Sequence, residues 1–204
     1  MMKLAKLVVT AGAVLCLTTF AATLAAAPQV GKPAPDFNVK DANGQSHSLQ
    51  DFAGKNVVLE WTNHDCPFVV KHYSGNMQSL QRDMQAKEVV WLTVISSAPG
   101  KQGHIDSAKV AELTSSRNAS PKAVLFDESG TMGKAYDAKT TPHMYVIDKE
   151  GVLQYMGGID SIPSTKVADI DKATPYFANA AKAVLAGNTP DPAVTKPYGC
   201  SVKY

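Results

Sequence analysis

Short, continuous runs of apolar residues recur along the chain and predict its strands. Runs of four to eight such residues are typical of strands that are buried on both faces of a sheet. Asn43-Gly44 lies between two short extended stretches and predicts the turn of a hairpin. The strands predicted from the apolar runs span residues 56–63, 89–95, 123–126 and 144–147, with an antiparallel return over 152–156 after a turn at Lys149-Glu150-Gly151.

Apolar residues three and four positions apart lie between these runs and predict the helices. A helix is expected from Pro67 to about Ala86, because Met77 and Met84 fall on one of its faces. Gly75 is expected to break or kink this helix, since glycine is a poor helix former. The same spacing predicts helices over 106–116 and 175–185, and a short helix or turn over 130–138.

The order of these elements predicts the fold class and the domain organisation. Strands that alternate with helices, followed by a closing hairpin and a last helix, are typical of an α/β sandwich with a mixed sheet. We expect one domain over residues 28–187. Residues 188–204 contain Pro190, Pro192 and Pro197 and predict an extended C-terminal tail.

The first 27 residues have the pattern of a secretory signal peptide. Lys3 and Lys6 precede an apolar run, and the run ends in the small residues Ala25, Ala26 and Ala27. We expect cleavage near residue 27, a periplasmic or secreted protein, and no stable membrane insertion afterwards. An uncleaved anchor is the alternative, because the apolar run approaches the length that spans a bilayer.

Charge and cysteine content narrow the function classes. The chain has 20 Lys and Arg against 18 Asp and Glu, and the signal segment carries two of the lysines and no acid, so the remaining chain has no net formal charge. This balance does not favour nucleic acid or an anionic membrane surface as a partner. Cys16 lies in the signal segment, which leaves Cys66 and Cys200 as an even pair in an oxidising compartment.

Cys66 is the strongest candidate for chemistry. It lies where a predicted buried strand meets a predicted helix, and Pro67 occupies the first turn of that helix. Unpaired backbone N–H groups at a helix start favour a thiolate, which makes the sulfur nucleophilic. A structural half-cystine or an inert buried thiol is the alternative interpretation. His64 or His72 would support the thiolate if either were protonated beside it.

Four segments, in this order, resemble the thioredoxin-like superfamily. The resemblance is to its redoxin branch, which includes the peroxiredoxins (alkyl hydroperoxide reductase and thiol-specific antioxidant proteins), and to the periplasmic thioredoxins of cytochrome maturation. It implies a three-layer α/β sandwich over about residues 30–187 and thiol-dependent redox chemistry. The segments are Gly31 to Phe37, Trp61-Thr62-Asn63, Cys66-Pro67-Phe68-Val69, and Thr140-Thr141-Pro142 leading into Tyr145 to Asp148.

The resemblance also implies the surroundings of Cys66. In thioredoxin-like proteins the proline before the later strand is cis and lies beside the active cysteine, so Thr141 and Pro142 would form the loop on the substrate side. His143 would then lie near the sulfur. The other residues expected to line the pocket, from their places beside Cys66, are Trp61, Asn63, His64 and Pro67.

Two departures from the family patterns separate this chain from both subfamilies. Thioredoxins have a second cysteine three residues after the first, and Val69 stands at that position here. Peroxiredoxins have Thr or Ser three residues before the reactive cysteine, and here that residue is Asn63. Neither motif is intact, so the sequence favours neither peroxide nor a protein disulfide as the substrate.

Cys200 offers a replacement for the missing local cysteine. A proline-punctuated arm of about a dozen residues can carry it back to Cys66, since extended chain spans about 3.3 Å per residue. Cys66 would attack a peroxide or a partner's disulfide, Cys200 would resolve the product, and an external thiol would reduce the resulting disulfide. A permanent Cys66–Cys200 disulfide that only stabilises the fold is the alternative.

Two further function classes remain open. His64, Cys66 and His143 are ligand types that suit copper or zinc, and the Sco-type copper-delivery proteins share the thioredoxin-like fold. Those proteins use two cysteines and a histidine, however, and this chain lacks the local second cysteine. The second alternative is a binding or structural domain with the same fold and no catalytic activity. The glycines at 31 and 157–158 are turn glycines, no nucleotide or flavin motif is present, and we expect no cofactor.

Overall fold

The computed structural model of the protein describes residues 27–204. The expected signal segment, residues 1–27, therefore lies outside the described residues except for its last position. Within the described part, no helix combines the length and the apolar character that crossing a membrane requires.

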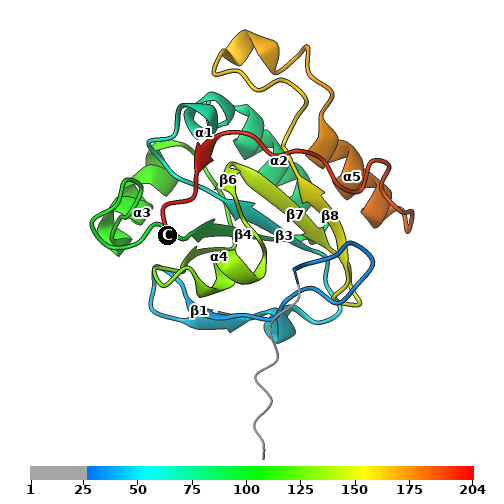
Figure 1. Cartoon of the computed structure of the whole chain (residues 1–204), viewed down its shortest axis with the longest axis horizontal. Coiled ribbons are helices and arrows are strands. Elements are labelled where there is room, and N and C mark those ends of the chain that lie inside the picture. The colour runs from blue at the N-terminus through cyan, green and yellow to red at the C-terminus, as the bar shows by residue number, and fades with distance from the viewer. Residues whose placement is uncertain (1–26) are drawn as a thin grey trace, which may run out of the picture.

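A five-stranded mixed sheet forms the centre of the protein (Figure 1). The middle strand is β3 (Val57–Trp61), and its mostly apolar sequence suits burial on both faces. β3 runs parallel to β4 (Val90–Ile95) and antiparallel to β7 (His143–Ile147), so Leu59 lies opposite both Leu92 and Tyr145. In sheet order the strands are β5 (Ala123–Phe126), β4 (Val90–Ile95), β3 (Val57–Trp61), β7 (His143–Ile147) and β8 (Leu153–Gly157).

The single helix expected over 67–86 is two helices, and Gly75 separates them. Gly75 has a φ of 139°, a backbone conformation that residues with a Cβ rarely adopt, so the chain turns there and a new helix begins. The helices are α1 (Pro67–His72), α2 (Asn76–Gln85), α3 (Ser107–Ser116), α4 (Thr131–Ala135) and α5 (Tyr176–Leu185), with short 3₁₀ segments η1 (Leu49–Phe52) and η2 (Val167–Asp169).

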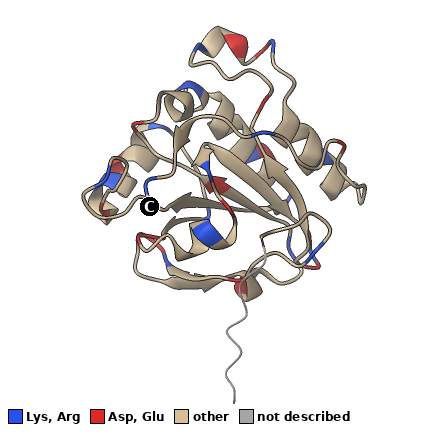
Figure 2. Cartoon of the chain, in the orientation of Figure 1, with Lys and Arg blue, Asp and Glu red and all other residues tan. Residues whose placement is uncertain are grey.

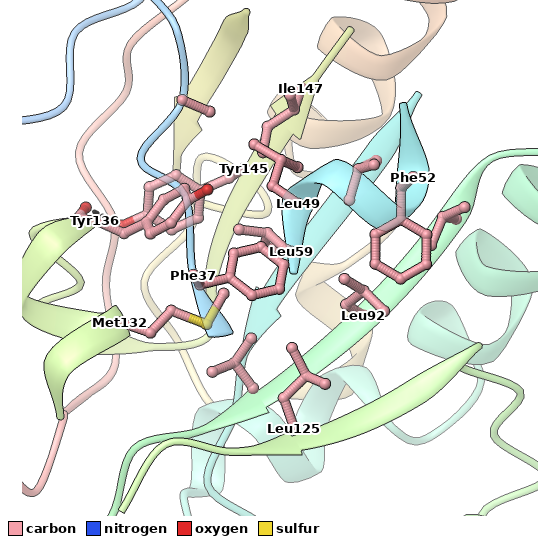
Figure 3. Packing of buried hydrophobic residues seen from close by; sticks show 14 of the residues in the cluster. Phe37, Leu49, Phe52, Leu59, Leu92, Leu125, Met132, Tyr136, Tyr145 and Ile147 are labelled. Atoms are coloured by element: carbon pink, nitrogen blue, oxygen red, sulfur yellow. Dashed lines mark hydrogen bonds between the residues drawn. The ribbon is translucent and has the colours of Figure 1, made fainter. Parts of the chain in front are cut away.

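Two apolar clusters, one on each face of the sheet, make the three-layer arrangement. Alternate residues of β3 point to opposite faces, so Val58 belongs to one cluster and Leu59 to the other. The Val58 cluster packs under α2 and α5. The Leu59 cluster, shown in Figure 3, packs under α4, η1 and the predicted hairpin, whose strands are β1 (Asn38–Lys40) and β2 (Ser46–Ser48).

The C-terminal tail, residues 188–204, lies against the domain. After α5 it passes along β8, where the Thr195 hydroxyl hydrogen-bonds the Tyr155 hydroxyl. It then forms β9 (Cys200–Ser201), which pairs antiparallel with β6 (Thr140–Thr141). Figure 1 shows this red segment crossing from α5 to the region beside β6 and α1. Residues distant in sequence thus meet at one end of the sheet.

Charged residues of both signs are interspersed over the helices and loops (Figure 2). Some ionisable side chains are nevertheless buried, and their positions matter for the site. Glu60 and Lys71 have exposed fractions of 0% and 1%. His72 and Asp160 are buried as well. Since burial of an unpaired charge is unfavourable, each of these groups needs partners inside the protein.

Candidate active site

Cys66 lies at the junction of strand and helix that the sequence predicts. It is the residue before α1, with φ of −70° and ψ of 121°, and Pro67 is the first residue of the helix. Proline suits this position because the first N–H groups of a helix have no partner within the helix. The Cys66 N–H donates to the carbonyl oxygen of Asn63 at 3.0 Å, which closes the turn between β3 and α1.

The structure brings Cys200 to the sulfur of Cys66. In the pairing of β6 with β9, Thr141 lies opposite Cys200. The Cys200 N–H contacts the Cys66 Sγ at 3.4 Å, and the Cys66 thiol donates to the Thr141 carbonyl oxygen at 3.1 Å. Both cysteines are free thiols; Cys66 has an exposed fraction of 0%, whereas Cys200 is partly exposed.

The two thiols have opposite pKa shifts. Burial alone raises the pKa of Cys66, but hydrogen bonds from the Cys200 thiol and the N–H groups of Val69 and Cys200 outweigh burial and lower it. Burial and the neighbouring Cys66 sulfur raise the pKa of Cys200 to about 11. The pair therefore favours a thiolate on Cys66 that accepts a hydrogen bond from a protonated Cys200.

The loop expected on the substrate side of Cys66 contacts its sulfur through Thr141. The Thr141–Pro142 peptide is cis, as the resemblance implies. His143 follows on β7 and is buried, and its Nδ1 hydrogen-bonds the Tyr145 hydroxyl at 2.9 Å. Burial lowers the pKa of His143 to about 3, so its imidazole is neutral at neutral pH and supplies no positive charge to a thiolate.

Asn63 and His64 hold the turn that precedes Cys66. The Asn63 carboxamide is buried; it accepts from the Asp65 N–H at 3.0 Å and donates to the Gln102 carbonyl at 3.4 Å. His64 Nε2 lies 3.2 Å from an Asp65 carboxylate oxygen. Burial lowers the pKa of His64, which disfavours the protonated form that would support a thiolate on Cys66.

Trp61 is a core residue of the central strand. Its ring packs against Tyr136 and Tyr145, with ring centroids 5.4 and 5.0 Å away. Its indole N–H donates to the Ser96 hydroxyl at 3.0 Å. These contacts place it in the apolar cluster of Leu59.

The alternative metal set is not gathered in the structure. Among residues 27–204, no group of three or more His, Cys, Asp and Glu side chains is placed to hold a metal ion. His64 instead pairs with Asp65, and His143 pairs with Tyr145. The set His64, Cys66 and His143 therefore does not form a metal centre here, which corrects that alternative.

A buried polar cluster holds the tail just before Cys200. The Tyr198 hydroxyl donates to an Asp160 carboxylate oxygen at 2.5 Å and hydrogen-bonds His72 Nε2 at 3.0 Å. Lys71 Nζ lies 3.3 Å from the other Asp160 oxygen and 3.4 Å from the Tyr198 hydroxyl. The Tyr198 ring packs against Phe68 of α1. We call Lys71, His72, Asp160 and Tyr198 the tail anchor.

The tail anchor has no local signature in the sequence. Lysine and aspartate usually lie at the surface, so nothing local marks Lys71 and Asp160 as buried partners. The one available signal was the composition of the tail, because a segment rich in aromatic residues such as Tyr198 and Tyr204 is unusual in a disordered terminus.

Gly199 provides a test of how the tail presents Cys200. Its φ is 133°, and a Cβ there would overlap the Thr141 carbonyl. We expect Gly199→Ala to weaken Cys66–Cys200 disulfide formation about 10- to 100-fold, the effect of about 1–3 kcal/mol of backbone strain. The measurement is the equilibrium constant for disulfide formation against glutathione. Gly187→Ala is the matched control, because Gly187 also has a positive φ but open space around it. Equal constants for both variants would contradict the prediction.

Comparisons with known proteins find a matching family profile and solved structures of the same fold. The AhpC/TSA family profile matches residues 30–156, which include Cys66 and Thr141 but not Cys200. The thioredoxin-like protein YneN of Bacillus subtilis (strain 168) is 30% identical over 128 residues, or 62% of this chain and 69% of YneN. Two crystal structures share the fold: a hypothetical protein, SMc02350, from Sinorhizobium meliloti 1021 (TM-score 0.72, 23% identity, 88% of this chain and 96% of that one) and an uncharacterized conserved protein from Geobacillus kaustophilus (0.71, 24%, 86% and 92%).

Proposed function

This chain belongs to the AhpC/TSA family, a branch of the thioredoxin-like superfamily, and we propose that it is a thiol-dependent oxidoreductase in which Cys66 and Cys200 form a redox couple. The observation that carries the proposal is the contact of the Cys200 backbone N–H with the Cys66 Sγ at 3.4 Å. These residues are 134 positions apart. Val69 stands where the local motif would have a second cysteine, and Cys200 of the tail takes the place of that cysteine.

Cys66 is the nucleophile of the proposed cycle. Its thiolate attacks one oxygen of a peroxide, the O–O bond breaks, and the leaving oxygen takes up a proton to give an alcohol or water. The product on Cys66 is a sulfenic acid. With a disulfide as oxidant, the same thiolate attacks one sulfur, the second sulfur leaves as a thiolate, and a mixed disulfide remains on Cys66.

Cys200 completes the oxidation. Its sulfur attacks the Cys66 sulfur, and the hydroxyl of the sulfenic acid leaves as water with the Cys200 proton. From a mixed disulfide, the partner's thiol leaves instead. Both routes end in a Cys66–Cys200 disulfide, and two external thiols reduce it while they form one disulfide of their own. The approach of the Cys200 backbone N–H to the Cys66 Sγ at 3.4 Å supports this step, because the tail already lies beside Cys66.

The burial of Cys66 favours a small oxidant. With β9 in place Cys66 has no exposed surface, so a folded protein disulfide reaches it only after the tail moves. A peroxide needs a far smaller opening. We therefore propose peroxide as the first oxidant to test, with protein disulfides as the second.

The cellular location belongs to the same proposal. The basic and apolar pattern of residues 1–27 supports export to the periplasm or secretion. An exported thiol oxidoreductase needs a thiol donor in that compartment. The proposed partners are therefore the oxidant and a reducing thiol, which is either a protein or a small molecule.

Intact-mass analysis of three proteins tests the couple: the wild type, Cys66→Ser and Cys200→Ser, each reduced and then given one equivalent of hydrogen peroxide. We expect the wild type to lose the mass of two hydrogens through a Cys66–Cys200 disulfide. Cys200→Ser should retain a sulfenic acid on Cys66 that dimedone captures. Cys66→Ser should consume no more peroxide than a denatured control.

Two results would contradict the proposed function. One is peroxide and disulfide consumption by Cys66→Ser at the wild-type rate. The other is a wild-type disulfide that resists glutathione and whose reduction unfolds the domain, which is the behaviour of a permanent structural disulfide. Replacing peroxide by an oxidised protein substrate in the same three-protein series distinguishes the two oxidants.

A further inference from the structure

A small pocket between α3 and the sheet lies apart from the two cysteines. Its volume of about 40 Å³ is room for about three water-sized groups, since one such group needs roughly 10–15 Å³. Much of its wall is apolar and comes from Ile95 of β4, Val124 of β5, and Val110 and Leu113 of α3. In the described part of the chain no Asp or Glu lines this pocket, and neither Cys66 nor Cys200 does.

Arg117, the residue at the C-terminal end of α3, brings a positive charge to the pocket. Its Nη2 donates to the His64 carbonyl at 3.0 Å, and its guanidinium lies 4.7 Å from the centre of the Tyr73 ring. Among residues 27–204 no carboxylate forms an ion pair with Arg117. A guanidinium has five N–H donors in a fork that matches a carboxylate, so Arg117 retains donors for an anion.

Two further polar groups of the pocket have no partner within the protein. The Thr62 hydroxyl and His64 Nδ1 are buried, and neither has a hydrogen-bond partner among the residues that the structure describes. Thr62 has an exposed fraction of 9%. Because a buried polar group without a partner is unfavourable, both groups point to a bound molecule that supplies the partners.

The contact of His64 with Asp65 shows which kind of partner His64 needs. Its Nε2 lies 3.2 Å from an Asp65 carboxylate oxygen, which can only accept a hydrogen bond. Nε2 therefore carries the proton, and in the neutral imidazole Nδ1 is an acceptor. Burial lowers the pKa of His64, which favours this neutral form. The partner of Nδ1 is accordingly a donor such as a hydroxyl group.

The three polar groups together define a class of ligand. Arg117 calls for an anion, the Thr62 hydroxyl can donate to the same anion, and His64 calls for a hydroxyl donor. A carboxylate with a hydroxyl on the neighbouring carbon supplies all of these, and its CH groups suit the apolar wall. The volume of the pocket restricts the ligand to a skeleton of very few carbon atoms. Water alone would leave the charge of Arg117 without a counter-ion.

We propose that this pocket binds a small 2-hydroxy carboxylate, whose carboxylate pairs with Arg117 and accepts from the Thr62 hydroxyl, and whose hydroxyl donates to His64 Nδ1. The site is independent of the proposed redox couple, because it includes neither cysteine. Its ligand would nevertheless join α3 to the turn that precedes Cys66, since Thr62 and His64 belong to that turn.

Titration of the reduced wild-type protein with glycolate, followed by ¹⁵N NMR at neutral pH and constant ionic strength, tests the proposal. Two comparison probes are acetate, which lacks the hydroxyl, and glycolamide, which lacks the charge. We expect glycolate to shift the resonances of Thr62 and Arg117 and to bind about tenfold more tightly than either probe, because each probe leaves one buried group without a partner. Equal affinities, or shifts confined to residues outside the pocket, would overturn the inference.

Substitutions in the pocket distinguish a site from a structural role. Thr62→Val keeps the shape of the side chain and removes a hydroxyl that has no partner, so the ligand-free variant should be at least as stable as the wild type. Its affinity for glycolate should nevertheless fall about five- to tenfold. Arg117→Lys keeps the charge but loses the fork, and should weaken binding about tenfold.

Lys182→Gln is the matched control for these variants, because Lys182 lies exposed on α5 and does not line the pocket. It should bind glycolate as the wild type does. Wild-type affinity in folded Thr62→Val would overturn the inference, even if Arg117→Lys failed to fold. A loss of affinity in Lys182→Gln equal to that in Arg117→Lys would also overturn it, since binding would then follow only the net charge of the protein.

Discussion

Asp160→Asn is expected to lower the free energy of unfolding by about 3–5 kcal/mol, because it leaves the Lys71 ammonium buried without its carboxylate. The Lys71 side chain has an exposed fraction of 0%, and its Nζ lies 3.3 Å from the Asp160 carboxylate. Its remaining partners are the Ile162 carbonyl at 3.2 Å and the Tyr198 hydroxyl at 3.4 Å. Neither of these carries the negative charge that compensates a buried cation.

Urea unfolding of the wild type and Asp160→Asn at neutral pH measures this effect. Glu112→Gln is the matched control: Glu112 pairs with Lys109 at the surface, and its loss should change stability by no more than about 1 kcal/mol. The double variant Lys71→Met with Asp160→Asn removes the lone charge, so it should recover much of the loss. Asp160→Asn within about 1 kcal/mol of the wild type would contradict the prediction.

The same substitution should also loosen the tail. Asp160 accepts hydrogen bonds from the Tyr198 hydroxyl and from the Ile162 N–H, which lies 3.0 Å away. With an uncharged acceptor in its place, Tyr198 is held less firmly, and Cys200 spends less time against Cys66. The Cys66–Cys200 disulfide should consequently form less favourably in Asp160→Asn, in the glutathione equilibrium described for Gly199→Ala.

Glu60→Gln is expected to remove a pH dependence of stability that amounts to about 3–4 kcal/mol in the wild type. Glu60 lies fully buried in β3 and accepts hydrogen bonds from Tyr73, Trp91 and Thr93 at 2.8, 2.9 and 3.1 Å. Burial nevertheless raises the pKa of Glu60 to about 7, since these donors only partly offset the loss of water.

The sign of this dependence follows from the protons bound in each state. An unfolded glutamate ionises near its ordinary pKa of about 4.3, whereas folded Glu60 keeps its proton until about pH 7. Its contribution is therefore fully present below about pH 4.3 and is lost as the pH rises to about 7. Above that range the contribution is constant, because both states are ionised.

Unfolding free energies of the wild type and Glu60→Gln between pH 4 and 8 measure the difference. The difference between the two unfolding free energies is the readout, because two histidines change the stability of both proteins in the opposite direction. Burial is the chief cause that lowers the pKa of His72 to about 4 and that of His143 to about 3. Glu112→Gln applies the same substitution at the surface and should run parallel to the wild type. If the pH profile of Glu60→Gln ran parallel to that of the wild type, folded Glu60 would have no raised pKa, and the prediction would be wrong.

Local patterns were sufficient for most of the fold. The run at 89–95 corresponds to β4 at Val90–Ile95, and the helix expected over 175–185 corresponds to α5 at Tyr176–Leu185. Strands buried on both faces and helices with one apolar face carry their signal in neighbouring residues. A break or kink at Gly75 was predicted because glycine is a poor helix former, although only the structure shows that it separates two helices.

The sequence motifs predicted the position of Cys66, and the length of the tail allowed Cys200 to reach it, but the contacts that hold the tail could not be predicted. The position of Cys66 and the cis peptide before Pro142 were expected from residues beside them and from the family resemblance. The path of residues 188–204 was not, because a proline-rich segment has no periodicity that indicates where it packs. The burial of Lys71 and Asp160 could not be predicted either, because charged residues usually lie at the surface and only the structure shows that these two are buried together.

The sequence by itself determined the junction that carries Cys66: a buried strand, a turn, and a cysteine at the start of a helix, all set by neighbouring residues. The tertiary structure decided which groups meet that cysteine. Cys200 reaches Cys66 across 134 positions because β9 pairs with β6 and Tyr198 binds Asp160. Such contacts depend on the packing of whole elements and on the mutual burial of polar partners, and neither is encoded in a short stretch of chain.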